Sequence, residues 1–388
     1  MNEKKKLQLD LRAPTTSILS SLLCIVIGVA VGFIFLVLLA WIAMNQRGDV
    51  CTFGTVMQKA WADGFIKMIK GGFTYLPNMK GLGQEITRMS ALMMTGLSVA
   101  FAFKTGLFNI GAAGQYVLGA FGALLCAIVF QLPWWVCLIC ATLFGAIWGA
   151  IPGIFKATLN INEVITCIMT NWIALYGCNT LMYMNGQSPL YNLKTTKTWP
   201  IAISPNSKIP DLGLAELFNN PSTTIGIFIA IAAAIVIYIV LNKTTFGYEL
   251  KACGHNKNAA RYAGINEKRN IVLAMVIAGA LAGLGAGLYY LSGAEEWSPL
   301  ASTALPAMGF DGISVALLAS SNPLGTILSS LFISHLKIGG STMNMAYFPK
   351  EMSDAISGII IYLCAFTLLF RTKLTALLFG RKKAKKGE

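Results

Sequence analysis

Long uncharged apolar segments alternate with shorter polar segments along most of this chain. A helix needs about 20 apolar residues to cross the roughly 30 Å of hydrocarbon in a bilayer. Segments of this kind predict membrane-spanning helices at about 17–44, 86–103, 105–130, 134–155, 164–184, 223–241 and 271–291. Two shorter apolar segments predict further helices at 303–319 and 324–337, and a last span is predicted at about 355–370. We therefore expect an all-α polytopic membrane protein of about ten transmembrane helices.

The polar segments predict how the chain is divided. They indicate basic tails at 1–16 and 371–388, a transmembrane domain at 17–370, an outer loop at 185–222 and an internal loop at 242–270. Residues 45–84 are amphipathic, with apolar residues at helical spacing, which favours a segment lying along the membrane surface.

Composition and charge agree with this division. The chain has 388 residues, of which 55% are hydrophobic and 12% are charged, whereas soluble proteins carry roughly 25% charged residues. The net charge of +14 arises largely from the two tails and the 242–270 loop, while the outer loops hold fewer Lys and Arg residues. Positive charge marks the cytoplasmic side of a membrane protein, so we expect both termini and this loop in the cytoplasm. The excess charge then reflects topology, and no nucleic-acid partner is expected.

Glycine recurs at every fourth position in two of the predicted helices. The positions are Gly145, Gly149 and Gly153 in the first and Gly279, Gly283 and Gly287 in the second. Such spacing forms a flat groove that lets another helix approach closely. We interpret both grooves as packing devices that carry no information about a substrate.

Cysteine and histidine give no sign of catalysis. Cys137 and Cys140 form a C-x-x-C pattern, but they lie in an apolar helix without a nearby His or charged residue, where cysteine acts as a small hydrophobe. We expect no disulfide and no metal site. His255 and His335 are far apart in sequence and predicted topology, so a membrane-embedded enzyme is disfavoured.

The segment GLFNIGAAGQ, residues 106–115, places two amides among glycines at the start of an apolar helix. Asn109 and Gln115 are costly in lipid and should face a cavity or another helix. The glycines permit a broken or re-entrant backbone, which is tolerated only where protein or water surrounds it. The alternative is a helix start eased by glycine, with both amides at the interface.

The segment MGFDGISVALL, residues 308–318, repeats this pattern later in the chain. Phe310 and Asp311 before Gly312 echo Phe108 and Asn109, and two interrupted segments at corresponding positions point to a site between transporter repeats. The competing interpretation for Asp311, as for Glu163, is a helix cap, because acidic residues favour helix N-termini.

The loop FGYELKACGHNKNAARYAGINEKRN, residues 246–270, contains a short run at 256–262 able to form one or two helical turns. Small and apolar residues of the loop, such as Ala259 and Ile265, distinguish the loop from a simple charged linker. It suits docking into a groove of another protein, although a solvated basic loop is the alternative.

Four segments, in this order, resemble the permeases of bacterial ABC importers for nucleosides and simple sugars. They are GLFNIGAAGQ, NEVITCIMTNWIALYG (162–177), GYELKACGHNKNAARYAGIN (247–266) and MGFDGISVALLASSNPLG (308–325). The resemblance covers roughly 55–370 and is greatest to the larger permease of the nucleoside systems. It departs from the family pattern at Ala113, where glutamate is common, at Thr170, where leucine is usual, and at 318–321.

The resemblance implies a bundle like that of the vitamin B12-type (type II-like) permeases, located in the bacterial cell membrane and forming half of a translocation pathway. The implied pathway residues are Phe108, Asn109, Gln115, Asn171, Phe310 and Asp311. The residues implied to couple the chain to its ATPase are Gly254, Asn256, Ala259, Ala260, Arg261 and Ile265.

The implied partners are an ABC ATPase subunit, a second and smaller permease, a substrate-binding lipoprotein, membrane lipid and the nucleoside itself. The chain lacks the phosphate-loop motif G-x-x-x-x-G-K-[ST], so ATP and Mg²⁺ are expected in the ATPase partner, with no cofactor and no enzyme activity in this chain. Two alternatives remain. One is a permease for a ribose-like sugar, and the other is an ion-coupled secondary transporter using Glu163, Asp311 or His335.

Overall fold

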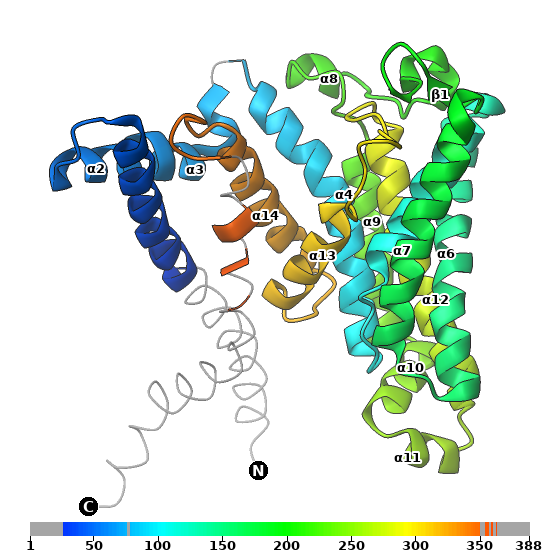
Figure 1. The fold of residues 1–388 in the computed structure, drawn as a ribbon. Helices are drawn as coiled ribbons and strands as arrows, with labels where there is room; N and C mark the ends of the chain where they lie inside the picture. The colour runs from blue at the N-terminus through cyan, green and yellow to red at the C-terminus, as the bar shows by residue number, and fades with distance from the viewer. Residues whose placement is uncertain (1–25, 76–77, 350–353, 357, 360–361, 363–388) are drawn as a thin grey trace, which may run out of the picture. The chain divides into compact units, whose positions relative to one another are not determined.

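The computed structural model describes residues 26–362 apart from 76–77, 350–353, 357 and 360–361 (Figure 1). The described residues are helical, apart from loops and a small antiparallel pair of strands, β1 Tyr191–Asn192 and β2 Lys197–Thr198. Helices long and apolar enough to span a membrane are Val26–Arg47, α4 Lys80–Lys104, α5 Ala112–Leu124 with its π-helical extension η3 Leu125–Val129, α6 Trp134–Leu159, α7 Glu163–Tyr183, α9 Gly226–Lys243 and α12 Glu267–Tyr290. The predicted all-α polytopic fold is confirmed.

Three of the ten predicted spans are not matched by a full-length helix among the described residues. Helices α13, Ala307–Leu318, and α14, Gly325–Ser341, fall on the two short predicted segments but are shorter than a full span. Most of the predicted helix at 355–370 lies outside the described residues, as do both basic tails. The count of ten and the vitamin B12-type arrangement therefore stay predictions.

Shorter elements connect the long helices. Before α4 they are α2 Phe53–Lys59, the π-helix η1 Ala60–Phe65, α3 Ile66–Lys70 and the 3₁₀-helix η2 Gly71–Tyr75. Between α7 and α9 they are the 3₁₀-helices η4 Met184–Gly186, η5 Ile201–Ile203 and η6 Pro205–Ser207, the two strands, and α8 Leu214–Leu217. Between α9 and α12 they are α10 Thr245–His255 and α11 Lys257–Tyr262.

The chain divides into two compact units. The larger is Gly72–His335, and the smaller combines Met1–Gly71 with Leu336–Glu388. Within the smaller unit, the amphipathic stretch packs on the first long helix through aromatic rings, because Phe33 lies 5.7 Å from Trp61 and 5.1 Å from Phe65 between ring centroids.

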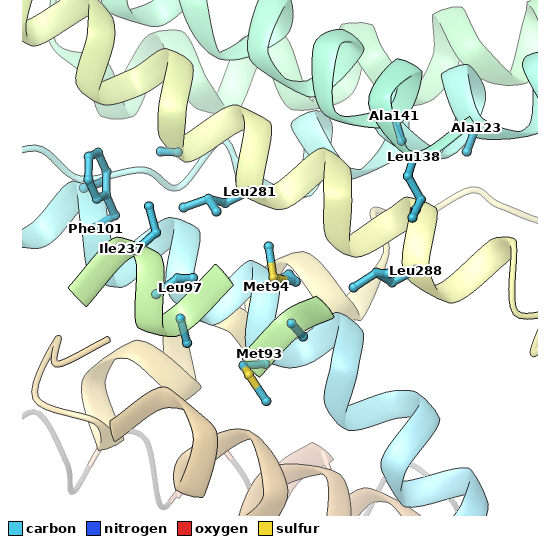
Figure 2. Close-up of a cluster of buried hydrophobic side chains, with 14 of the residues drawn as sticks. Met93, Met94, Leu97, Phe101, Ala123, Leu138, Ala141, Ile237, Leu281 and Leu288 are labelled. Atoms are coloured by element: carbon cyan, nitrogen blue, oxygen red, sulfur yellow. The ribbon is translucent and has the colours of Figure 1, made fainter. Parts of the chain in front are cut away.

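In the larger unit, burial separates interior helices from peripheral ones. The apolar stretches of α4 and α5 are 83% and 78% buried, whereas those of α6 and α9 are 33% and 28% buried. Met93, Met94 and Leu97 of α4 lie in a core that α12 completes with Leu281 and Leu288 (Figure 2). The exposed apolar faces of α6 and α9 are those expected of helices that meet lipid.

The two glycine grooves pack against each other. A Cβ atom at Gly145 of α6 would lie 2.4 Å from the carbonyl oxygen of Gly279, and one at Gly279 would lie 2.3 Å from the carbonyl oxygen of Gly145. A Cβ atom at Gly283 would lie 2.3 Å from the oxygen of Ala141. These distances leave no room for side chains, so the predicted packing role is confirmed, with each groove as the other's partner.

Candidate functional site

A tight turn between α4 and α5, residues 105–111, forms the centre of the first predicted motif. Gly106 adopts a left-handed φ of 74°, which glycine tolerates without a steric penalty. Phe108 then stacks on Phe103 of α4, with ring centroids 5.1 Å apart. The backbone is broken at this point, as the glycines predicted.

The two amides of this motif hydrogen-bond to each other. Asn109 Nδ2 donates to Gln115 Oε1 at 2.8 Å, and Gln115 Nε2 donates to Asn109 Oδ1 at 3.0 Å. Asn109 Nδ2 also donates to Ser98 Oγ at 3.0 Å. Both amides are buried, and this mutual pairing offsets the cost of burying them. They face α4 and each other in this conformation, so their assignment to the substrate pathway stays a prediction.

Asn171 of α7 holds the turn from a third helix. Its Oδ1 accepts the backbone N–H of Gly114 at 2.8 Å, and its Nδ2 donates to the carbonyl oxygen of Ile110 at 3.0 Å. The first N–H groups of a helix have no partner within the helix, and Asn171 satisfies one of them at the start of α5. The structure therefore brings Asn109, Gln115 and Asn171 together around one turn.

The second predicted motif packs directly on the first. A Cβ atom at Gly309 of α13 would lie 2.3 Å from the Cα of Ala113, and one at Gly312 would lie 2.8 Å from the carbonyl carbon of Thr95 in α4. The small side chain of Ala113 thus lies against the first turn of α13. The two interrupted segments are neighbours in space.

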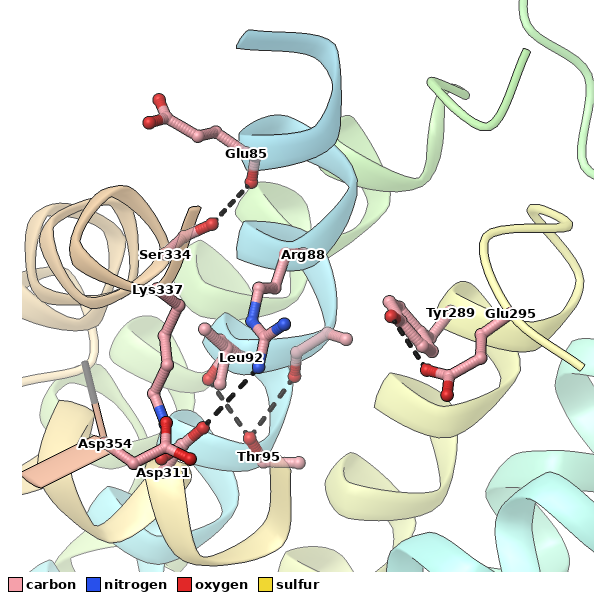
Figure 3. A network of polar contacts seen from close by, with 11 residues as sticks. Glu85, Arg88, Leu92, Thr95, Tyr289, Glu295, Asp311, Ser334, Lys337 and Asp354 are labelled. Carbon is pink, nitrogen blue, oxygen red and sulfur yellow. Dashed lines mark hydrogen bonds and ion pairs between the residues drawn. The ribbon is translucent and has the colours of Figure 1, made fainter. Parts of the chain in front are cut away.

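Asp311 of α13 faces Arg88 of α4, a residue that lies outside the four sequence motifs (Figure 3). Their side-chain atoms Oδ2 and Nη2 are 4.0 Å apart, and the side chains are 11% and 26% exposed. An arginine inside an apolar helix is itself a functional signal, and it was available from the sequence. The neighbouring Phe310 is 39% exposed, and its assignment to the substrate pathway stays a prediction.

Two further acidic residues are paired within the larger unit. Glu163, at the start of α7, lies 2.8 Å from Lys156 Nζ of α6. Glu85 of α4 is 2% exposed and was not singled out in the sequence; its Oε1 accepts the N–H of Gly72 at 2.6 Å and lies 2.7 Å from His335 Nδ1. Glu163 and Glu85 each therefore contact a basic side chain in this structure.

The predicted docking loop forms α10 and α11. The side chain of Asn256 caps α11 by accepting the N–H of Ala259 at 3.1 Å, as expected of asparagine at a helix start. Ala260 is only 3% exposed, whereas Tyr262 is 95% exposed and Arg261 is also exposed. Ile265 closes the helix, its N–H donating to the Ala260 oxygen at 3.0 Å. The predicted short helix is confirmed, and its exposed residues include Asn258, Ala259, Arg261 and Tyr262.

Gly254, near the end of α10, touches the turn between α4 and α5. A Cβ atom at Gly254 would lie 2.4 Å from the carbonyl carbon of Thr105 and 2.6 Å from the nitrogen of Gly106. The α10–α11 pair is thus in backbone contact with the turn at 105–111, to which Asn171 is also hydrogen-bonded. Its role in coupling stays a prediction.

Comparisons with known proteins identify the relatives of the chain. It is 34% identical over 323 residues to the nucleoside ABC transporter permease protein NupB of Lactococcus lactis subsp. cremoris, covering 81% of this chain and 87% of that protein. It is 36% identical over 295 residues to the guanosine ABC transporter permease protein NupP of Bacillus subtilis, covering 75% and 82%. It is 29% identical over 319 residues to the glucose ABC transporter permease protein TsgB13 of Haloferax volcanii, covering 79% and 82%.

No solved structure matches the chain. The family described as the branched-chain amino acid transport system permease component matches residues 82–365, which span the broken turn, the α10–α11 loop and α13. The resemblance drawn from the four motifs is confirmed. The chain belongs to this family of membrane permeases.

Proposed function

We propose that the chain is the larger permease subunit of an ATP-driven importer and forms half of the translocation pathway for nucleosides. The observation that carries this proposal is the identity of 34% and 36% to two permeases whose names specify nucleosides and guanosine. Each similarity extends over more than four fifths of the relative.

The same relatives support one of the expected partners, a second permease. The chain is also 25% identical to NupC and 26% identical to NupQ, permeases that carry the same system names as NupB and NupP. This pairing supports an importer with two different permeases. ATP hydrolysis, with its Mg²⁺, belongs to a separate ATPase subunit, and a lipoprotein delivers the substrate at the outer face of the bacterial cell membrane.

The geometry of the larger unit supports a mechanism of alternating access. The exposed face of α11 docks on the ATPase subunit. Movement of α10 is passed to the turn at 105–111 because Gly254 contacts that turn through backbone atoms alone. Asn171 hydrogen-bonds to Ile110 of the turn, and Gly309 of α13 packs on Ala113 just after it, so both shift with the turn. A packed element with two discrete arrangements is what such coupling requires.

A sugar is the second candidate substrate. The glucose permease TsgB13 is 29% identical over 79% of this chain, so the family also includes sugar carriers. The lower identity, compared with the two nucleoside permeases, ranks this candidate second.

Reconstitution of the whole importer tests the proposal. Proteoliposomes containing this chain, its ATPase, the second permease and the lipoprotein should accumulate labelled guanosine or adenosine when ATP is supplied. Uptake should resist uncouplers and should not be outcompeted by ribose or glucose. Uptake of a sugar alone would favour the second candidate, and uptake abolished by uncouplers would contradict an ATP-driven importer.

A further inference from the structure

A cavity of about 260 Å³ lies in the larger unit beside the Arg88–Asp311 pair. Its walls come from α4, α5, the end of α12, the segment after α12 and the start of α13. The residues that line it and carry the argument are Arg88, Tyr116, Tyr289, Tyr290, Glu295 and Trp297. Its volume is close to the lower end of the ~300–1,000 Å³ typical of small-molecule sites, so it suits a small solute.

Aromatic rings form one side of this cavity. Tyr290 lies 6.2 Å from Tyr116 and 5.8 Å from Trp297 between ring centroids. Trp297 is held in place, because its indole Nε1 donates to Asn179 Oδ1 at 2.8 Å and its backbone N–H donates to Thr198 Oγ1 at 3.1 Å. A fixed aromatic wall of this kind favours flat, partly apolar ligands.

Two buried polar atoms in the same walls lack hydrogen-bond partners in the described protein. The hydroxyl of Tyr116 has none although the residue is 1% exposed, and the Nε of Arg88 has none either. More than about 90% of buried polar groups in proteins are hydrogen-bonded, so two such atoms at one cavity call for an explanation. A ligand that accepts hydrogen bonds supplies it.

The charges around the cavity exclude an anion. Glu295 and Glu296 line it together with Arg88, and the Tyr289 hydroxyl already donates to Glu295 Oε2 at 3.1 Å. Figure 3 shows Tyr289 hydrogen-bonded to Glu295, with Arg88 on the neighbouring helix α4. A phosphate would meet two carboxylates there, whereas a neutral ligand with both acceptors and donors would find complementary groups on either side.

We propose that this cavity is a nucleoside subsite in which a neutral nucleobase lies against Tyr290 and Trp297 and accepts hydrogen bonds from Tyr116 and Arg88. The carboxylate of Glu295 accepts from the donors of the same solute. The proposal rests on the proposed function and adds the place where this chain recognises the base. A free sugar also accepts hydrogen bonds, but it lacks the flat aromatic ring that lies against Tyr290 and Trp297, so it is not the ligand.

Photolabelling of the assembled importer tests the subsite. The complex in lipid nanodiscs is irradiated with 8-azidoadenosine, and the labelled peptides of this chain are identified by mass spectrometry. We expect label on residues 289–298, prevented by excess adenosine and not by excess ribose. Label confined to other segments of this chain, or protection by ribose, would overturn the subsite.

A pair of matched variants separates a specific contact from general damage. Tyr116→Phe removes only the hydroxyl and should lower labelling of 289–298 by roughly three- to ten-fold, the effect of one lost hydrogen bond. Tyr176→Phe makes the same change on the exposed face of α7 and should leave labelling unchanged. Equal labelling in Tyr116→Phe and wild type would refute the proposed contact.

If Tyr116→Phe does not assemble, the Glu295→Gln variant takes its place, because it keeps the shape of an exposed side chain and removes its charge. It should likewise lower labelling of residues 289–298.

The proposed subsite and the proposed importer function fail in different experiments. Wild-type uptake of nucleosides without label at 289–298 removes the subsite and leaves the importer function intact. Absence of any nucleoside uptake by the wild-type complex removes both.

Discussion

Gly254 of α10 and Gly106 of the α4–α5 turn are in contact through their backbones, with no side chain between them. A Cβ atom at Gly106 would lie 2.3 Å from the Cα of Gly254. Because neither backbone can yield as a flexible side chain would, displacement of one segment must displace the other. This contact joins the exposed α10–α11 pair to the helices of the bundle.

The first prediction concerns this contact. Gly254→Ala should separate α10 from the turn and lower ATP-driven uptake at least roughly ten-fold, because the added Cβ meets only backbone atoms. The ATPase subunit should remain bound, since α11 is unchanged. Uptake and co-purification of the ATPase with the reconstituted complex are measured together. Gly177→Ala, where a Cβ meets nothing within 4 Å, is the control, and equal uptake by both variants would contradict the coupling role of Gly254.

The second prediction concerns the docking face of α11. Arg261→Glu reverses an exposed charge and should release the ATPase subunit, lowering its co-purification and abolishing uptake while the lipoprotein still captures substrate. Ala260→Glu should also abolish uptake, but through misfolding, because Ala260 is buried. Thermal unfolding of the isolated chain separates the two effects.

Lys194→Glu, an equal charge reversal in the exposed outer loop, is the control for Arg261→Glu. It should leave the ATPase attached. Retention of the ATPase by Arg261→Glu would refute docking through this face.

The third prediction concerns the clamp formed by Asn171. Asn171→Leu leaves the N–H of Gly114 and the oxygen of Ile110 without their partner, which should lower the free energy of unfolding by about 1–3 kcal/mol. Thermal unfolding of the purified chain in detergent measures the change. Asn206→Leu, at an exposed asparagine of the outer loop, should change stability little. If Asn171→Leu leaves the free energy of unfolding unchanged, the turn at 105–111 does not depend on Asn171 for its stability.

The fourth prediction concerns the helix pair α6–α12. Gly279→Ala places a Cβ 2.3 Å from the oxygen of Gly145 and should destabilise the chain by roughly 1–3 kcal/mol, the usual cost of overpacking. Gly54→Ala, where a Cβ meets nothing within 4 Å, should be neutral or slightly stabilising. Denaturation of both variants beside wild type checks the difference, and equal stabilities would contradict the packing role.

These contacts show which features the sequence could reveal. Apolar length predicted the long helices, because the bilayer imposes it locally. The four-residue glycine spacing predicted a groove, and the Asn256–Tyr262 run predicted a short helix, since both depend on neighbours within one turn or two. Such features are encoded over short stretches of chain.

Contacts between distant segments were not accessible in this way. Asn171 was chosen through family resemblance, but its bonds to Ile110 and Gly114 join residues 61 and 57 positions apart. The aromatic cavity combines residues from α4, α5 and α12 that share no pattern. Arg88 was detectable as a charge in an apolar segment, yet its partner Asp311 depends on how α13 packs on α4.

The last prediction concerns this pair, Arg88 and Asp311. Breaking a buried ion pair lowers the free energy of unfolding by about 3–5 kcal/mol. Because Arg88 is partly exposed, solvent weakens this pair. Asp311→Asn should therefore lower the free energy of unfolding by about 1–3 kcal/mol. Arg88→Gln should be similarly destabilising, and the double variant should recover part of the loss, which a double-mutant cycle of unfolding free energies would reveal. If Asp311 serves packing and not ion coupling, Asp311→Asn importers that assemble should keep ATP-driven, uncoupler-resistant uptake. Two results together would instead assign Asp311 a direct part in transport. One is loss of uptake in a stably assembled Asp311→Asn complex. The other is a double-mutant cycle in which the losses of unfolding free energy from the two single variants simply add.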